Sequence, residues 1–109
     1  MKASEIRIGN WVLSPTEGEI QIENGWQIDE GEEIKPIPLT KKWLDSIEGD
    51  GSFRLRYIKS IDAFEVEREY ISFEKEEWVF ISNCRYRHEW QNLHFALTGE
   101  ELKEKQNDT

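Results

Sequence analysis

Hydrophobic and polar residues alternate with a period of two through the middle of the chain, which is the pattern of a β-strand with one buried face. The stretch SFRLRYI, 52–58, places Phe53, Leu55 and Tyr57 on one side of a strand and two arginines on the other. AFEVEREYISF repeats this alternation, and EEWVFIS forms a third run. Together the three runs predict an antiparallel meander from 52 to 82 with one face exposed to water.

The charged residues on the exposed face of this meander are predicted to stabilise the sheet. Arg54 and Arg56 point outward from the first strand, and Glu65, Glu67 and Glu69 point outward from the second. Opposite charges that face each other across neighbouring strands contribute about 0.2 to 1 kcal/mol per pair. We therefore expect the arginines to pair with glutamates of the next strand.

The first third of the chain is predicted to be β structure with turns. The run EIQIE alternates isoleucine with polar residues, Asn24-Gly25 follows it, and a second alternating run comes next. Asn-Gly between two such runs is a strong signal for a hairpin turn, so we expect a hairpin over 18–29. Pro36 and Pro38 exclude a central strand or a helix and predict an extended edge or connector.

Two helices are expected. The first covers about 41–48, because Thr40 can cap it and Trp43, Leu44 and Ile47 share one face. CRYRHEW is expected to continue the third strand, with Arg85 and Arg87 projecting together. A second helix then covers about 88–98 and ends at Gly99. Its apolar stripe, expected to cover the meander, consists of Trp90, Leu93, Ala96 and Leu97.

These elements define an α+β fold: a small, strongly bent antiparallel sheet with an SH3-like N-terminal part, a short central helix and a C-terminal helix packed on the sheet. A chain of 109 residues is long enough for one compact domain and too short for two with full cores. We expect a single domain over 1–102, followed by a polar tail over 103–109.

The charge distribution limits the classes of partner that this protein could bind. Asp and Glu total 23 against 14 Lys and Arg, a formal net charge of -9. Between residues 8 and 34 the charged residues are all acidic: Glu17, Glu19, Glu23, Asp29, Glu30, Glu32 and Glu33. This composition disfavours direct binding of nucleic acid, which needs clustered Lys and Arg. The acidic run is either a solubilising surface or a patch that steers toward a basic partner.

A second candidate surface consists of Arg54, Arg56, Arg85 and Arg87. If the strands bring these residues together, they could bind RNA or an acidic partner.

The residues offer little for catalysis or metal binding. His88 and His94 are six apart, about 240° around a helix, and with Cys84 they match no metal-binding spacing. No nucleophile elbow or phosphate-binding loop is present. We therefore predict no catalytic residues, no metal and no cofactor, and a non-enzymatic protein.

The predicted location is the cytoplasm of a bacterial cell, without membrane association. No stretch approaches the roughly 20 apolar residues of a membrane helix, and the N-terminus lacks the apolar core of a signal peptide. Cys84 is the single cysteine, which excludes an internal disulfide and fits a reducing compartment.

Three motifs carry a resemblance: IRIGNWV at 6–12, IKPIPLTKKWLDSIEG at 34–49 and HEWQNLHFALTGEEL at 88–102. In this order they resemble a family of small uncharacterised proteins found in genomes, prophages and mobile elements of Bacteroidetes-type bacteria. The chain departs from the family's closing motif at Arg87, Trp90 and His94, where Val, Leu and Tyr are common. The resemblance implies a bacterial or phage origin and supplies no catalytic residue.

The leading hypothesis is a non-enzymatic phage or mobile-element accessory protein. It would bind and inhibit or modulate a basic, nucleic-acid-handling host protein, for example an RNA-guided defence nuclease, in the manner of anti-CRISPR proteins. The alternative is a structural or assembly component of a phage or mobile element without an inhibitory role. An enzyme with an unrecognised carboxylate site is a third hypothesis.

Overall fold

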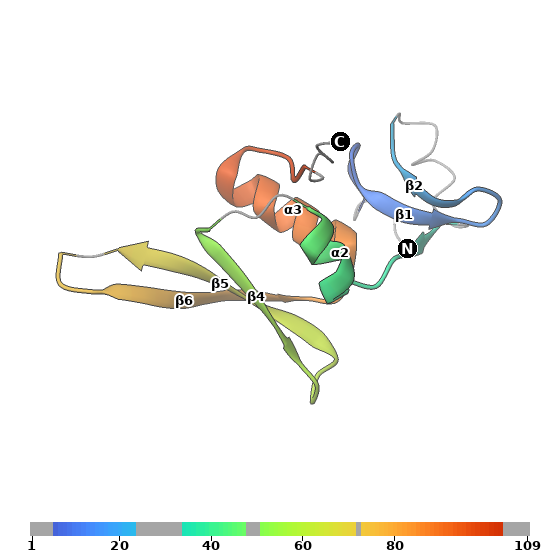
Figure 1. Cartoon of the computed structure of the whole chain (residues 1–109). Coiled ribbons are helices and arrows are strands. Elements are labelled where there is room, and N and C mark those ends of the chain that lie inside the picture. Colours follow the sequence, from blue (N-terminus) through green and yellow to red (C-terminus); the bar gives the residue numbers. More distant parts are fainter. Residues whose placement is uncertain (1–5, 24–33, 48–50, 72, 104–109) are drawn as a thin grey trace, which may run out of the picture. The chain divides into compact units, whose positions relative to one another are not determined.

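The computed structural model of the chain describes residues 6–23, 34–47, 51–71 and 73–103. Its fold is α+β, as predicted, with two antiparallel sheets of three strands and two helices (Figure 1). The chain forms two compact units, one of residues 1–38 and 86–103 and the other of residues 39–85 and 104–109. Two units can still unfold in one step, so the single domain over 1–102 stays a prediction.

The first unit contains a small sheet with the strand order β2-β1-β3. Strand β1 (Trp11–Ser14) pairs with β2 (Gly18–Gln21) on one side and with β3 (Lys35–Pro36) on the other. Pro36 therefore lies in a short edge strand, as its lack of an N–H group requires. The expected hairpin over 18–29 extends outside the described residues, and within them β2 pairs with β1.

The hydrophobic core of the first unit is made of isoleucine and valine. Val12 and Ile22 are 0% and 1% exposed, and Ile6 and Ile34 are buried beside them. Ile20 packs against this cluster from β2. The SH3-like character of the N-terminal part stays a prediction.

Helix α3 (Arg87–Thr98) belongs to the same unit and contacts β1. Its first turn is closed by the Glu89 carboxylate, which accepts a hydrogen bond from the Tyr86 N–H at 3.0 Å. Gly99 ends it in the left-handed conformation with φ of 76°, which glycine adopts without steric cost. The expected helix is confirmed, and the sheet strand that it contacts is β1.

Two details of this helix were predicted wrongly. The third strand ends at Cys84 and the helix begins at Arg87, so CRYRHEW does not continue as a strand. Among the buried residues of the helix, His88, Trp90, Gln91 and His94, only Trp90 belongs to the predicted apolar stripe. Ala96 is exposed instead. The polar residues can be buried because most have hydrogen-bonding partners, described below.

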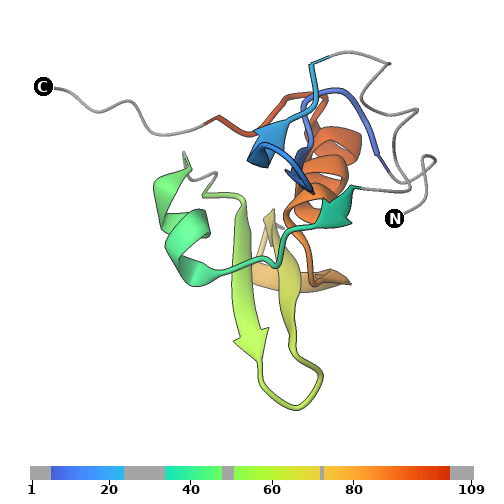
Figure 2. The ribbon, with the colours of Figure 1, turned by 90° about the vertical axis from the view of Figure 1, so that its right-hand side faces the viewer.

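The second unit contains the predicted meander. Strands β4 (Phe53–Ile58), β5 (Ala63–Ile71) and β6 (Glu76–Cys84) pair antiparallel in the order β4-β5-β6. Figure 2 shows β4 and β5 joined by their connecting turn. Leu55 opposes Val66 and Tyr57 opposes Phe64 across β4 and β5, although Tyr57, expected on the apolar face, is 49% exposed.

Helix α2 (Lys41–Ser46) also lies in the second unit. Thr40 caps it as predicted, since its side-chain oxygen accepts a hydrogen bond from the Trp43 N–H at 3.2 Å. Trp43 and the C-cap residue Ile47 are buried. The glycine stop expected after the helix falls partly outside the described residues, and the helix ends before it.

Candidate functional site

The structure describes only part of the acidic run that the sequence singled out. Glu17, Glu19 and Glu23 lie in the first unit and are exposed. The other members, Asp29, Glu30, Glu32 and Glu33, lie outside the described residues.

One acidic candidate pairs with one arginine candidate. Both terminal guanidinium nitrogens of Arg87 donate to the Glu19 carboxylate, at 3.1 and 3.3 Å. The Arg87 side chain is only 11% exposed, whereas that of Glu19 is 52% exposed. A two-pronged arginine–carboxylate pair fixes the geometry of both groups. Glu19 and Arg87 therefore join α3 to β2 and contribute to the fold of the first unit.

The arginines of β4 pair with glutamates of β5, as the alternation predicted. Arg54 donates to Glu67 at 3.0 Å, and Arg56 donates to Glu65 at 3.2 Å. The Arg54 guanidinium carbon also lies 4.6 Å from the centre of the Trp78 ring, at cation–π distance. These contacts give both arginines a structural role on the meander. Glu67, expected to point outward to water, is instead buried, beside the register shift between Val66 and Glu67.

The fourth arginine candidate differs from the other three. Arg85 is exposed and follows β6, and its guanidinium donates to the Ile61 carbonyl oxygen at 3.3 Å. Because the strand ends at Cys84, the alternation expected to align Arg85 with Arg87 is absent. Arg54, Arg56 and Arg85 belong to the second unit, and Arg87 belongs to the first.

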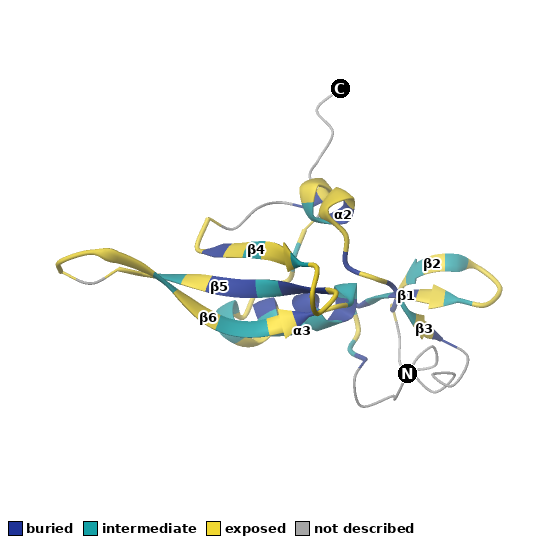
Figure 3. Cartoon of the chain, turned by 90° about the horizontal axis from the view of Figure 1, so that it is seen from below, coloured by how far each residue is buried: buried dark blue, intermediate teal, exposed yellow. Residues whose placement is uncertain are grey.

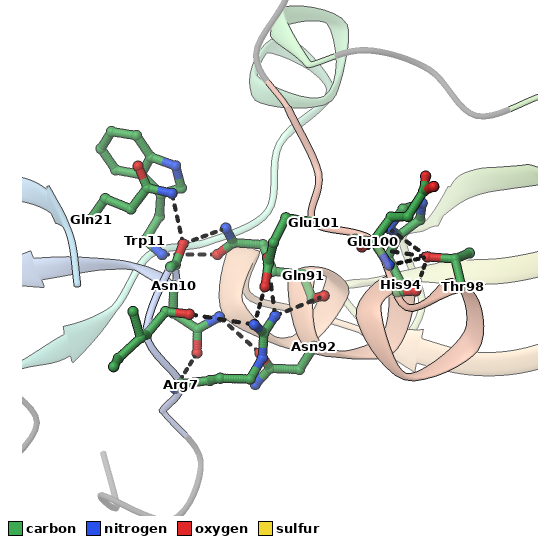
Figure 4. Close-up of polar contacts among 12 residues, drawn as sticks. Arg7, Asn10, Trp11, Gln21, Gln91, Asn92, His94, Thr98, Glu100 and Glu101 are labelled. Atoms are coloured by element: carbon green, nitrogen blue, oxygen red, sulfur yellow. Dashed lines mark hydrogen bonds and ion pairs between the residues drawn. The ribbon is translucent and has the colours of Figure 1, made fainter. Parts of the chain in front are cut away.

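A polar network that the sequence did not predict joins the two ends of the first unit (Figure 4). The Gln91 side chain accepts a hydrogen bond from the Trp11 N–H at 2.8 Å and donates to the Gly9 carbonyl at 2.9 Å. The Asn10 amide donates to the Asn92 side-chain oxygen at 2.8 Å. Gln91 and Asn10 are 2% and 0% exposed. Their side chains add to the backbone hydrogen bonds that Gly9 and Asn10 make with Ile22.

Arg7 extends the network to the surface. Its guanidinium donates to Asn92 at 3.1 Å, forms an ion pair with Glu101 and lies 4.3 Å from the Phe95 ring centre. Because every one of these partners belongs to the same unit, the geometry is that of a structural clasp. We call Arg7, Asn10, Gln91, Asn92 and Glu101 the terminal clasp.

The clasp joins residues of the first and third motifs. IRIGN supplies Arg7 and Asn10, and QNL with GEE supplies Gln91, Asn92 and Glu101. The available signal was a pair of amides, Gln91 and Asn92, inside an otherwise amphipathic helix. Their partners lie about 80 residues away in the chain, so local periodicity could not identify them.

The histidines and the cysteine occupy buried structural positions. His94 Nδ1 lies 3.0 Å from the Glu100 carbonyl oxygen, and the His94 ring meets Trp90 edge-on at 5.5 Å. Cys84 is 2% exposed at the end of β6. In the described ranges no group of three His, Cys, Asp or Glu residues could hold a metal ion. None of the helices of those ranges is long and apolar enough to cross a bilayer.

One ionisable group has a shifted pKa. The Tyr57 hydroxyl donates to the Asp62 carboxylate at 2.6 Å. This hydrogen bond raises the pKa of Tyr57 above its ordinary value of 10.0, with smaller contributions in the same direction from desolvation and from the negative charge of Asp62. Asp62 has φ of 49°, a left-handed conformation that Asp and Asn tolerate better than most residues. The pair therefore stabilises the turn between β4 and β5.

Comparisons of the chain with protein-family models, with curated proteins and with solved structures find no match. The resemblance of the three motifs to a Bacteroidetes-type family therefore stays a prediction.

Proposed function

We propose that this chain is a non-enzymatic accessory protein of a phage or mobile element that binds a basic, nucleic-acid-handling host protein in the bacterial cytoplasm. Binding would inhibit or modulate that protein, and an RNA-guided defence nuclease is the specific candidate. The observation that carries the proposal is the charge distribution, with seven acids and no base between residues 8 and 34.

The long acidic run supports a basic partner through electrostatic complementarity. A surface of one sign accelerates association with a partner of the opposite sign and makes the association sensitive to salt. Glu17 and Glu23 are exposed in the part of the run that the structure describes. Glu19 forms an ion pair with Arg87, so we leave it out of the proposed partner contacts.

The contacts of the arginines favour a protein partner over RNA as the direct ligand. Arg54, Arg56 and Arg87 each have a carboxylate partner. A phosphate would have to compete with these carboxylates, and repulsion from the glutamates would oppose its approach. We therefore expect labelled RNA, titrated at two salt concentrations, to give no salt-dependent binding signal.

A pull-down from lysate of the bacterial host tests the proposal, with retained proteins identified before and after a salt wash. The bait is compared with a variant in which Glu30, Glu32 and Glu33 are changed to lysine. The matched control changes three acids elsewhere, Asp45, Glu104 and Asp108, to lysine, which alters the net charge equally. Glu19 is left intact because its loss would disturb the fold.

The proposal predicts one salt-sensitive nucleic-acid enzyme that the unaltered chain and the control retain and the first variant loses. Equal retention by both variants would assign the acidic run a solubilising role only. A defined oligomer that retains no host protein would instead favour a structural or assembly component.

A further inference from the structure

Apolar side chains are exposed in unusual density on the hairpin formed by β5 and β6. Of the ten large hydrophobic residues exposed in the described ranges, five lie on this hairpin. They are Tyr70 (64% exposed), Ile71 (73%), Phe73 (110%), Val79 (45%) and Phe80 (52%). Single exposed hydrophobic residues are normal on a protein surface, whereas a contiguous group marks an interaction site.

The topology places Tyr70, Ile71 and Phe73 where the sheet has only two strands, whereas Val79 and Phe80 oppose Arg68 and Glu67, which also pair with β4. Pairing between β4 and β5 ends at Phe53 and Arg68, while β5 and β6 stay paired as far as Ile71 and Glu76. Figure 3 shows the change along the hairpin, from buried positions on the inner part of β5 to exposed positions at the far end. A two-stranded ribbon gains little stability from exposed apolar side chains. Core packing therefore does not account for them.

The register distributes the group over both faces of the ribbon. Tyr70 opposes Glu77 and Val79 opposes Arg68 on one face. Ile71 and Phe80 occupy the other face, since residues one apart along a strand point to opposite sides. Phe73 lies at the turn. A hairpin that is apolar on both faces and at its tip fits insertion into a groove better than docking on a flat surface.

The charges around the tip indicate which charge the groove of the partner has at its rim. Between residues 69 and 77 there are four glutamates, Glu69, Glu74, Glu76 and Glu77, and one base, Lys75. Lys75 is already paired with Glu77 at 3.1 Å. The tip is therefore negative, and a complementary groove has lysine or arginine at its rim. A second copy of this chain would bring glutamates against glutamates, which disfavours it as the occupant.

We propose that the outer part of the β5–β6 hairpin is a docking tip, made of Tyr70, Ile71 and Phe73 at the far end and of the neighbouring β6 residues Val79 and Phe80. It inserts into an apolar groove of a partner protein whose rim is basic. The docking tip shares no residue with the acidic run of residues 8–34, and its test does not depend on that run.

Site-specific photo-crosslinking tests the docking tip. The full chain is expressed in the bacterial host with the photoreactive residue benzoylphenylalanine at position 73. The cells are irradiated, and the crosslinked peptides are then sequenced. The matched control carries the same residue at Leu13, which is also apolar and exposed (39%) but lies in the first unit. We expect position 73 to give one protein adduct that position 13 does not give. The crosslinked peptide should combine apolar residues with neighbouring lysine or arginine.

Two variants keep the result interpretable. Changing Glu74 and Glu76 to lysine should reduce the yield of the adduct at position 73 at least tenfold. Ile71→Ser should weaken binding to the identified protein by a similar factor, as expected when an anchor residue is lost. Circular dichroism spectra of both variants are compared with that of the unaltered chain to check that the variants are folded. An adduct with a second copy of this chain, an adduct with lipid, an adduct unaffected by charge reversal, or no adduct above the control would each overturn the proposal.

Discussion

The first unit and the far end of the β5–β6 hairpin use polar and apolar side chains in opposite ways. In the first unit Asn10, Gln91 and His94 are buried and hydrogen-bonded. On the hairpin, Ile71 and Phe73 are exposed. Burial of a polar group is tolerated when its hydrogen bonds are satisfied, and exposure of an apolar group is useful when a partner covers it. The polar residues therefore hold the fold, and the apolar tip is available for binding.

The largest expected effect comes from the buried face of α3. Trp90 is 3% exposed and contacts the His94 ring. Trp90→Ala leaves a large cavity, so we expect a loss of about 3 to 5 kcal/mol in the free energy of unfolding, measured by denaturant titration. The control Phe95→Ala, at a 39% exposed position of the same helix, should lose clearly less. Equal losses would mean that Trp90 is not a core residue.

The terminal clasp gives the next largest effect. Gln91→Leu keeps the size of the side chain and leaves the Trp11 N–H without its partner, which should cost about 1 to 3 kcal/mol. Gln21 provides a matched control, because it also donates to the Gly9 carbonyl, at 2.9 Å, from an exposed position. We expect Gln21→Leu to change the free energy of unfolding by less than about 0.5 kcal/mol. A stabilised Gln91→Leu protein would show that the clasp has a function other than folding.

The two ion pairs on the meander differ in burial: the Arg54–Glu67 pair is partly buried and the Arg56–Glu65 pair is more exposed. Glu67 has only 10% of its side chain exposed, whereas Glu65 has 24%, and only Arg54 also lies over Trp78. We expect Arg54→Ala to cost about 1 kcal/mol and Arg56→Ala about 0.5 kcal/mol. Denaturant titrations at low and high salt measure both. A larger loss for Arg56→Ala than for Arg54→Ala at either salt concentration would contradict this ranking.

The smallest effect concerns Tyr57, an exposed aromatic residue held by a polar contact. Its pKa is raised because the neutral hydroxyl donates to Asp62. The stabilisation is therefore fully present below the pKa of an unfolded tyrosine and is lost as pH rises through the folded pKa. Carbon NMR of the Tyr57 ring should titrate above 10.0, and Asp62→Asn should lower the midpoint. An unchanged midpoint in that variant would exclude Asp62 as the cause.

The sequence predicted the elements whose patterns are local. Alternation over 52–82 identified the meander and the pairing of the β4 arginines with glutamates of β5, and Thr40 identified the start of α2. These features depend on neighbouring residues, or on strands joined by short turns, so periodicity is enough to find them.

The terminal clasp and the start of α3 depend on contacts between distant parts of the chain. Gln91 and Asn92 are polar, so an amphipathicity argument places them on the exposed face, and only their partners at Trp11 and Asn10 make burial favourable. Arg87 alternates with Arg85 like a strand residue, although it begins the helix and pairs with Glu19. The docking tip follows the strand pattern, and only its exposure distinguishes it from a core strand.

The central claim is that buried polar residues stabilise the fold, whereas the docking tip does not. The free energies of unfolding of two variants, measured side by side, test this claim most directly. The comparison uses Gln91→Leu and the double variant Ile71→Thr, Phe73→Ser, which keeps a β-branched residue in β5. We predict that the double variant stays within about 1 kcal/mol of the unaltered chain, while Gln91→Leu loses about 1 to 3 kcal/mol. A double variant that is less stable than Gln91→Leu would show that the hairpin side chains support the fold, and would contradict the claim.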